Sequence, residues 1–277
     1  MEQRGIAITR CPFVCTLRPL RIDLNADVGE AFGAYTIGPD GVGHDAGLLK
    51  SVTSANVAAG FHAGDPSVLR DTIRAAKSHG VAVGAHPGFP DLVGFGRRDM
   101  NVTPKEAEDF VLYQIAAVAG VAAAEGVRLQ HVKPHGALFK MAAKDAGLAG
   151  AIARATAALD VSLILFGLPG SEILKAGRAA GLRVAAEAFA DRAYEADGSL
   201  VSRNKPGAVI DDAAVVVSRA IRMARDKVVI AIDGTTVTLE VDTICVHGDT
   251  RGANDLAARL RAGLEAAGVT VKAIGAP

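Results

Sequence analysis

Short apolar runs alternate with longer amphipathic stretches along most of the chain. Eight runs of six or seven residues have the composition of buried β-strands, and stretches with helical periodicity lie between most of them. The predicted strands are residues 21–27, 54–59, 81–86, 129–134, 162–167, 183–188, 243–248 and 269–274. The predicted helices are residues 66–79, 103–124, 144–159, 171–180, 211–225 and 254–267. Repeated β–α units predict a parallel sheet covered by helices.

Two of the predicted helices begin at capping sequences. Pro66 follows Asp65, and proline suits the first turn of a helix. Asp65 is then either the N-cap of this helix or a ligand contact. Thr103 and Glu106 have the spacing of a capping box.

The segment near residues 228–241 departs from the β–α pattern. Two runs of alternating polar and apolar residues flank Asp233 and Gly234. Asp-Gly is a strong signal for a two-residue turn between antiparallel strands. We therefore predict a β-hairpin inserted ahead of the seventh strand.

Polar or ionisable residues follow the ends of most predicted strands. They are Asp27, His62, His86, His135, Asp191 and Asp249. In an open sheet such residues would spread along an edge, whereas the carboxyl ends of barrel strands converge on one mouth. We therefore predict an α/β fold with a single TIM-like (β/α) barrel of seven or eight strands, in preference to an open doubly wound sheet.

Four predicted strands carry polar residues two positions apart, and side chains at that spacing share one face of a strand. The rows are Asp23, Asn25 and Asp27; His131, Lys133 and His135; Glu187 and Asp191; and His247 and Asp249. A buried charge costs several kcal/mol unless it is paired. Four such rows therefore predict a functional pocket.

Two residues of these rows have structural alternatives. Asp23 either faces a ligand or pairs with Lys133 or Arg192 inside the barrel. His131 lies early in its strand and is expected to be a structural hydrogen-bonding residue.

The loop after His86 (HPGFPDLVGFGRR) has stiff and flexible parts. Its two prolines restrict the backbone near the strand, and its later glycines leave the far end free to bend. Arg97 and Arg98 are therefore either surface charges or a lid that brings a guanidinium group to an anion.

Composition limits the classes of function. The chain has 277 residues, with 30 basic and 30 acidic side chains, so its charge gives no reason to propose nucleic acid or an anionic membrane as partner. No apolar run reaches the roughly 18 residues of a membrane span. Three cysteines argue against a disulfide framework and for a reducing cytoplasm. Residues 1–20 are predicted to be a poorly ordered extension, and residues 21–277 to form one catalytic domain.

Several common catalytic motifs do not occur in the sequence. It has no G-x-x-x-x-G-K-[ST] phosphate loop, no G-x-G-x-x-G fingerprint, no G-x-S-x-G elbow and no H-E-x-x-H helix. Cys245 lies between apolar neighbours and is expected to be a core residue. The remaining carboxylate, imidazole, lysine and arginine groups fit acid–base chemistry on a small polar molecule, with or without a divalent metal.

Six longer blocks follow one another along the chain. They read DLNADVGEAFG (residues 23–33), SANVAAGFHAGDP (54–66), GAHPGFPDLVGFGRR (84–98), VKPHGALF (132–139), EAFADRAYEADGSLVSR (187–203) and DTICVHGDT (242–250). Through these blocks the sequence resembles the LamB/YcsF family of 5-oxoprolinase A subunits. The family commonly has cysteine where this chain has Ala26 and Ala59, which argues against a cysteine-dependent mechanism at those positions.

The resemblance implies a barrel of the glycoside hydrolase/deacetylase type in a cytoplasmic, multi-subunit enzyme. The implied activity is hydrolysis of the lactam of 5-oxo-L-proline to L-glutamate, coupled to hydrolysis of ATP with Mg²⁺, together with subunits B and C. Phosphorylation of the carbonyl oxygen would activate an otherwise stable amide toward water. A homo-oligomer is left open.

The resemblance and the polar rows together suggest roles for individual residues. The candidate catalytic residues are Asp27, His62, His86, Lys133, His135, Glu187, Asp191, Arg192 and Asp249. The candidate substrate-binding residues are Asp23, Asn25, Asn56, Arg97 and Arg98. Lys133 and Arg192 would hold anionic groups, and Asp27 or Glu187 would act as base. Related deacetylases hold a metal with one Asp and two His, for which the candidates here are Asp27, His62 and His86.

Two other functions fit the same residues. One is a metal-dependent deacetylase or amidohydrolase that acts alone. The other is a non-catalytic subunit that binds a ligand or a partner.

Overall fold

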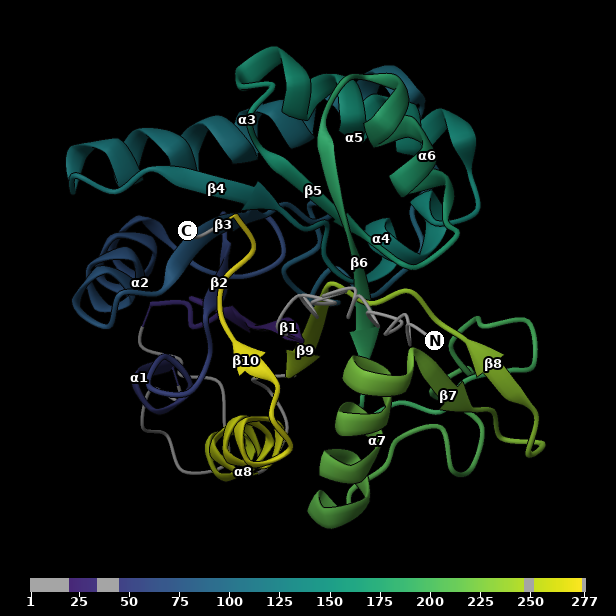
Figure 1. Ribbon diagram of the computed structural model, residues 1–277. Coiled ribbons are helices and arrows are strands. Elements are labelled where there is room, and N and C mark those ends of the chain that lie inside the picture. Colours follow the sequence, from purple (N-terminus) through teal and green to yellow (C-terminus); the bar gives the residue numbers. More distant parts are fainter. Residues whose placement is uncertain (1–19, 34–44, 247–251, 276–277) are drawn as a thin grey trace, which may run out of the picture.

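Seven parallel strands close into a barrel. The computed structural model describes residues 20–33, 45–246 and 252–275. The barrel strands are β1 (Arg21–Val28), β2 (Ser54–Ala58), β3 (Ala82–His86), β4 (Leu129–Val132), β5 (Ile164–Gly167), β6 (Arg183–Phe189) and β9 (Thr243–Val246). Each pairs with the next in this order, and β9 also pairs with β1 (Figure 1). The predicted barrel, in preference to an open sheet, is confirmed.

The eighth predicted strand exists but takes no part in closing the barrel. β10 (Thr270–Val271) pairs with Arg21 and Ile22, at the very start of β1. The rest of β1 is paired with β2 on one side and β9 on the other. The ring therefore has seven strands, and β10 extends the sheet at the amino-terminal end of β1.

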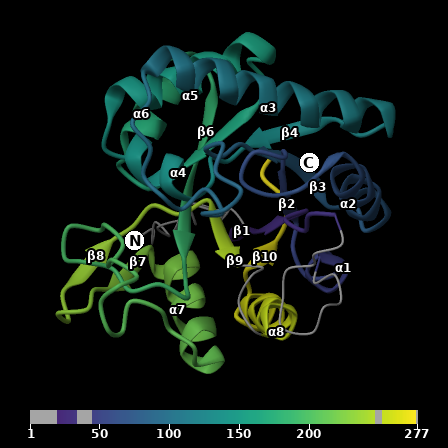
Figure 2. The same cartoon turned by 180° about the vertical axis from the view of Figure 1, so that it is seen from behind.

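Helices surround the barrel on the outside (Figures 1 and 2). They are α1 (Asp45–Leu48), α2 (Pro66–Ser78), α3 (Pro104–Ala124), α4 (Gly136–Ala142), α5 (Ala146–Leu159), α6 (Glu172–Ala179), α7 (Ala213–Asp226) and α8 (Ala253–Ala266). The short helices α1 and α4 were not predicted. α4 begins at Gly136, whose φ is 53°, and its N-cap residue His135 makes no side-chain capping hydrogen bond, so the sequence carries no capping signal for this helix.

The predicted caps are present. The Asp65 carboxylate accepts hydrogen bonds from the backbone N–H groups of Ser67 and Val68 at the start of α2. Thr103 and Glu106 form the reciprocal capping box of α3. Of the two alternatives for Asp65, the N-cap is thus the one the geometry supports.

The inserted hairpin is also present. β7 (Val228–Ile230) and β8 (Thr236–Thr238) form a separate antiparallel two-stranded sheet. In Figure 1 it lies beside α7, away from the barrel strands.

The two faces of the barrel wall differ in chemistry. Outward-facing strand residues such as Leu24, Val57 and Val83 join the large core that the helices cover. Inside, Ile164, Phe166 and Ala185 form a small apolar cluster of their own. The remaining interior positions carry the polar rows, so the barrel buries its apolar surface mainly on the outside.

Gly84 in β3 makes room for a side chain inside the barrel. A Cβ atom at this position would lie 2.1 Å from His131 Nε2. The His131 ring instead fills this space and stacks on Phe166, with ring centroids 4.4 Å apart. The glycine is therefore a packing requirement of the interior.

One helix of the described residues, α3, is long and apolar enough to cross a membrane by length and composition alone. It packs against β3, β4 and α5. It is therefore part of the layer of helices around the barrel.

Candidate active site

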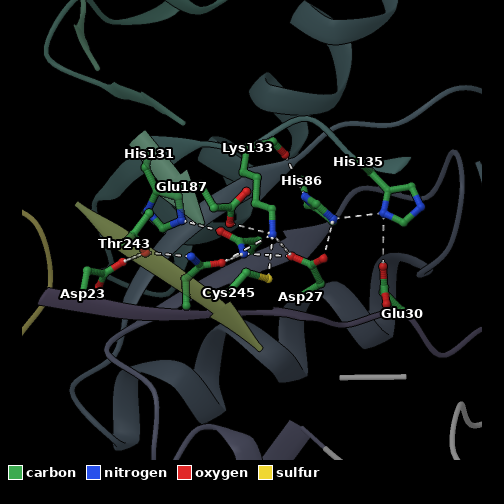
Figure 3. A network of polar contacts seen from close by, with 12 residues as sticks. Asp23, Asp27, Glu30, His86, His131, Lys133, His135, Glu187, Thr243 and Cys245 are labelled. Carbon is green, nitrogen blue, oxygen red and sulfur yellow. Dashed lines mark hydrogen bonds and ion pairs between the residues drawn. The ribbon is translucent and has the colours of Figure 1, made fainter. Parts of the chain in front are cut away.

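Residues from three of the four predicted polar rows meet inside the barrel and at its mouth. Figure 3 shows them as a continuous chain of contacts from Asp23 at one side to Glu30 at the other. The contacts fall into three groups: an inner layer, a charged centre around Lys133, and a histidine cluster at the outer end. Nearly all these side chains are buried.

The inner layer consists of Asp23, Asn25, Asn56, His131 and Thr243. Thr243 Oγ1 donates to Asp23 Oδ2 at 2.5 Å and accepts from Asn25 Nδ2 at 2.7 Å. Asn56 Nδ2 donates to Asn25 Oδ1 at 2.7 Å. His131 Nε2 lies 2.8 Å from Asn56 Oδ1, which fixes the proton on that nitrogen. Each donor in this layer has an acceptor.

Asp23 is held by hydroxyl groups. Besides Thr243, the hydroxyls of Thr53 and Ser54 donate to its Oδ1, each at 2.7 Å. Burial raises the pKa of Asp23, and the three hydroxyl donors only partly oppose this shift. The expected pairing of Asp23 with Lys133 or Arg192 is not found, because hydroxyl donors occupy both its oxygens. The expectation that His131 is a structural hydrogen-bonding residue is confirmed.

The charged centre consists of Lys133, Asp27, Glu187 and Cys245. Lys133 Nζ lies 2.8 Å from Asp27 Oδ1, 3.0 Å from Glu187 Oε1 and 3.0 Å from Cys245 Sγ. Asn56 Nδ2 also donates to Asp27 Oδ1, at 2.8 Å, and links the centre to the inner layer. One ammonium group thus sits between two carboxylates.

The two carboxylates have opposite pKa shifts. Burial opposes ionisation of Asp27, but His86 and Lys133 outweigh it and lower its pKa well below the usual value. Burial raises the pKa of Glu187, and Lys133 only partly offsets this. For Lys133, burial is outweighed by Asp27, Cys245 and Glu187, and its pKa is raised. Asp27 is thus the permanent anion and Glu187 the group better suited to exchange a proton.

The histidine cluster consists of Glu30, His62, His86 and His135. One ligating atom from each lies within 4.8 Å of those from the others, and all four residues are buried. His86 Nε2 lies 3.0 Å from His135 Nδ1 and 3.4 Å from Asp27 Oδ2. Glu30 Oε1 lies 3.2 Å from His62 Nε2 and 3.6 Å from His135 Nδ1. Imidazole and carboxylate groups in this arrangement are suited to holding a metal ion.

Burial keeps two of these imidazoles neutral. It lowers the pKa of His135 to about 3 and that of His62 well below its usual value, in both cases with a further contribution from neighbouring histidines. The rings of His62 and His135 are stacked, with centroids 3.8 Å apart. The cluster therefore contains two tightly packed neutral rings, those of His62 and His135, close to Glu30.

The sequence analysis missed three residues of the site, namely Thr243, Cys245 and Glu30. Cys245 was expected in the core; it is buried, but its thiol faces Lys133. Cys245 is two positions before His247 in the predicted strand, so the sequence already indicated that the two side chains share the inward face. Glu30 lies beyond β1, and Gly29, with a φ of 70°, turns the chain there. A residue after such a turn cannot be placed by strand alternation.

The loop after β3 packs onto the histidines. His135 Nε2 lies 2.8 Å from the carbonyl oxygen of Phe95, and the backbone N–H of Ala137 donates to Gly96 O. At Gly96, where φ is 61°, a Cβ atom would lie 2.7 Å from His62 Cβ. The glycine-rich end of the loop is thus needed for close approach to the rings.

The two arginines of this loop have partners within it. Arg98 forms an ion pair with Asp91, which lowers the pKa of Asp91 to about 2. The guanidinium of Arg97 lies 4.9 Å from the centre of the Phe95 ring. The charge of Arg98 is paired in its own loop, and its predicted contact with an anion stays a prediction. The predicted substrate contact of Arg97 stays a prediction.

The remaining candidates lie apart from these groups or outside the described residues. Arg192 is buried in the loop after β6, where its guanidinium donates to the carbonyl oxygens of Val201 and Ala208. Its predicted role in holding an anion stays a prediction. Asp191 is buried beside it. His247 and Asp249 fall outside the described residues.

Residues 22–277 match the LamB/YcsF family. The chain belongs to this family. Members with similar sequences include the 5-oxoprolinase A subunit of Chloroflexus aggregans (strain MD-66 / DSM 9485), which is 57% identical over 91% of this chain and 98% of that protein. The 5-oxoprolinase A subunit of Tolumonas auensis (strain DSM 9187 / NBRC 110442 / TA 4) is 54% identical over 92% of this chain and 99% of that protein.

A solved structure has the same fold. The lactam utilization protein from Thermus thermophilus is 48% identical and superposes with a TM-score of 0.86, covering 92% of this chain and 100% of that one. The whole barrel, including every strand that contributes to the site, is therefore shared with this LamB/YcsF relative.

Proposed function

We propose that the chain is the A subunit of an ATP-dependent 5-oxoprolinase. The observation that carries this proposal is the identity of more than 50% with 5-oxoprolinase A subunits along more than 90% of both sequences. The buried ammonium and carboxylate groups at the barrel mouth supply the chemistry that opening of an unactivated lactam needs. Subunits B and C are the proposed partners, and the cytoplasm is the proposed compartment.

The reaction requires activation of a stable amide. Transfer of the γ-phosphoryl group from ATP to the lactam oxygen breaks the bond to ADP and leaves an activated ring carbon. Water then adds to this carbon, the ring C–N bond breaks, and a proton passes to nitrogen. A second water releases the phosphate and yields glutamate. We leave open which of the three chains transfers the phosphoryl group.

The charged centre is suited to the ring-opening step. Lys133 offers a positive charge for the negatively charged phosphoryl group on the lactam oxygen. Glu187, whose pKa is raised by burial, is the proposed general base for water and then the acid for the leaving nitrogen. Asp27 stays ionised and orients Lys133 and His86. Asp23, Asn25 and Asn56 remain candidate substrate contacts, although their polar atoms bond mainly to one another.

Replacement of Lys133 tests this assignment. We expect Lys133→Met to lower glutamate formation about 10³-fold or more, because it removes the positive charge beside the phosphorylated oxygen. The measurement is release of glutamate and ADP by this chain combined with subunits B and C, ATP, Mg²⁺ and 5-oxoproline. Lys140→Met is the matched control, since Lys140 is exposed on α4.

Two outcomes would contradict the proposal. Full turnover in Lys133→Met would exclude Lys133 from the reaction. Absence of coupled glutamate and ADP formation with the wild-type chain and both partners would exclude the 5-oxoprolinase activity itself.

A further inference from the structure

We propose that Glu30, His62, His86 and His135 form a binding site for one transition-metal dication of the Zn²⁺ class. The site would be distinct from the Mg²⁺ that accompanies ATP. The proposal does not depend on the 5-oxoprolinase activity, because it concerns only how these four side chains face one another.

The protons of two of the rings are fixed by backbone carbonyl groups. His86 Nδ1 lies 2.7 Å from the carbonyl oxygen of Lys133, and His135 Nε2 lies 2.8 Å from that of Phe95. A carbonyl oxygen only accepts, so each of these nitrogens carries a proton. A ring that holds only this one proton presents its opposite nitrogen as an acceptor, so His86 Nε2 and His135 Nδ1 would then both carry lone pairs.

These two acceptors face each other at 3.0 Å. Oxygens of Glu30 and Asp27, which are also acceptors, lie 3.6 Å from His135 Nδ1 and 3.4 Å from His86 Nε2. Lone pairs held this close in a buried site repel one another unless a positive charge lies between them. The arrangement therefore requires a cation or an added proton.

The spacing fits a metal ion. Ligand atoms arranged tetrahedrally at about 2.0–2.2 Å from Zn²⁺ lie about 3.3–3.6 Å from one another. Three of the distances between ligating atoms of the cluster are 3.0, 3.2 and 3.6 Å, and all of these atoms lie within 4.8 Å of one another. Three imidazole nitrogens and one carboxylate favour Zn²⁺ and its neighbours over Mg²⁺ or Ca²⁺, which prefer oxygen ligands only.

The surroundings of the rings also fit. Metal-binding histidines usually donate their second N–H to a carbonyl or carboxylate group, which fixes the ring orientation. His86 and His135 both do so, and the second of these contacts comes from the glycine-rich loop after β3. Asp27 links the proposed metal site to Lys133, so a bound cation would lie next to the charged centre.

Metal binding by the full chain tests the proposal without any substrate. The protein is stripped with a chelator and dialysed against ZnCl₂ or CoCl₂ near neutral pH, and bound metal is counted by elemental analysis. We expect one equivalent per chain, a ligand-field spectrum for the Co²⁺ form, and a rise in the thermal unfolding midpoint on metal addition. His135→Gln should weaken binding at least 100-fold and Glu30→Gln about 10-fold, whereas the exposed His79→Gln should leave it unchanged.

Two results would overturn the proposal. If the wild-type chain takes up no stoichiometric Zn²⁺ or Co²⁺ and its unfolding midpoint does not move, the facing nitrogens share a proton instead. Stoichiometric binding that is unaffected in a folded His86→Gln, His135→Gln double variant would place the metal elsewhere. The wild-type midpoint needs no variant, so the test stands even if a substituted chain fails to fold.

Discussion

The inner layer and the charged centre lie next to each other in the barrel but follow opposite rules. In the inner layer, each donor meets an acceptor: Thr243 donates to Asp23 and accepts from Asn25. At the mouth, charged groups are concentrated around Lys133, and in the histidine cluster acceptors face acceptors. The donors of the inner layer are satisfied within the layer, whereas the charged groups at the mouth are suited to binding a substrate or a cation.

This difference separates structural from chemical roles among residues of similar type. A buried polar network with every partner present stabilises one arrangement of the strands. A buried network with repelling or unequal charges costs stability and is kept where function needs it. Substitutions in the two regions should therefore have different effects on stability and on turnover.

The largest expected effect is on turnover, from Glu187→Gln at the mouth. The amide has nearly the same shape but cannot exchange the proton, so we expect glutamate formation to fall about 10³-fold. The free energy of unfolding should change by less than about 1 kcal/mol, because Glu187 is costly to bury as a charge and Lys133 keeps Asp27 as partner. Activity assays of the complex and denaturant unfolding of the chain measure the two effects.

Glu265→Gln, on the exposed face of α8, is the control for this substitution. If Glu187→Gln lowered the free energy of unfolding by several kcal/mol and turnover were retained, this prediction would be wrong. Glu187 would then be a structural residue, like those of the inner layer.

The next effect is on stability, from Gly84→Ala beside the inner layer. The new methyl group would overlap the His131 ring, whose Nε2 lies 2.1 Å from the Cβ position. We expect a loss of about 2–3 kcal/mol in the free energy of unfolding, because the ring must leave Asn56 or the strand must shift. Chemical denaturation followed by circular dichroism measures it.

Gly120→Ala provides the matched control. Gly120 lies in α3 with open space around it, so alanine there should stabilise the chain by up to about 1 kcal/mol. Equal stability of the Gly84→Ala chain and the wild type would show that the inner layer tolerates rearrangement and is less constrained than its contacts imply.

Strand alternation explains why the sequence predicted so much of the site. Asp27, Lys133 and Glu187 lie on the inward faces of three strands, and side-chain parity follows directly from the order of residues. By the same rule the intervening residue Leu24 faces the helices, where it joins the large core. The number of strands in the ring could be determined only from the strand pairing. β10 has the composition of a barrel strand but pairs only with the start of β1.

The parts that were missed depend on turns and on packing between distant segments. Glu30 joins the histidines because Gly29 turns the chain after β1, and no periodicity reports such a turn. The pairing of Arg98 with Asp91 in the same loop was not predicted either. Cys245 has apolar neighbours in sequence, and only the register of β9 against β1 brings its thiol to Lys133.

The smallest expected effect is a change in pH dependence, from Asp23→Asn in the inner layer. Burial raises the folded-state pKa of Asp23 above its usual value of 3.8. Between that value and the raised pKa, the folded state holds a proton that the unfolded chain has lost. The stability linked to that proton is complete below about pH 4 and is lost as the pH rises through the folded pKa. The asparagine variant lacks this titration, so its stability should fall less steeply over the same range.

Denaturant unfolding of both chains from pH 4 to pH 8 isolates this contribution. Glu187 titrates in the same direction but is present in both chains, so the difference between their curves belongs to Asp23. We expect the curves to diverge by about 1 kcal/mol or less and turnover at neutral pH to stay within about threefold of the wild type. Parallel curves would show that the hydroxyls of Thr53, Ser54 and Thr243 hold Asp23 ionised, and a large loss of turnover would move Asp23 from the structural group to the substrate contacts.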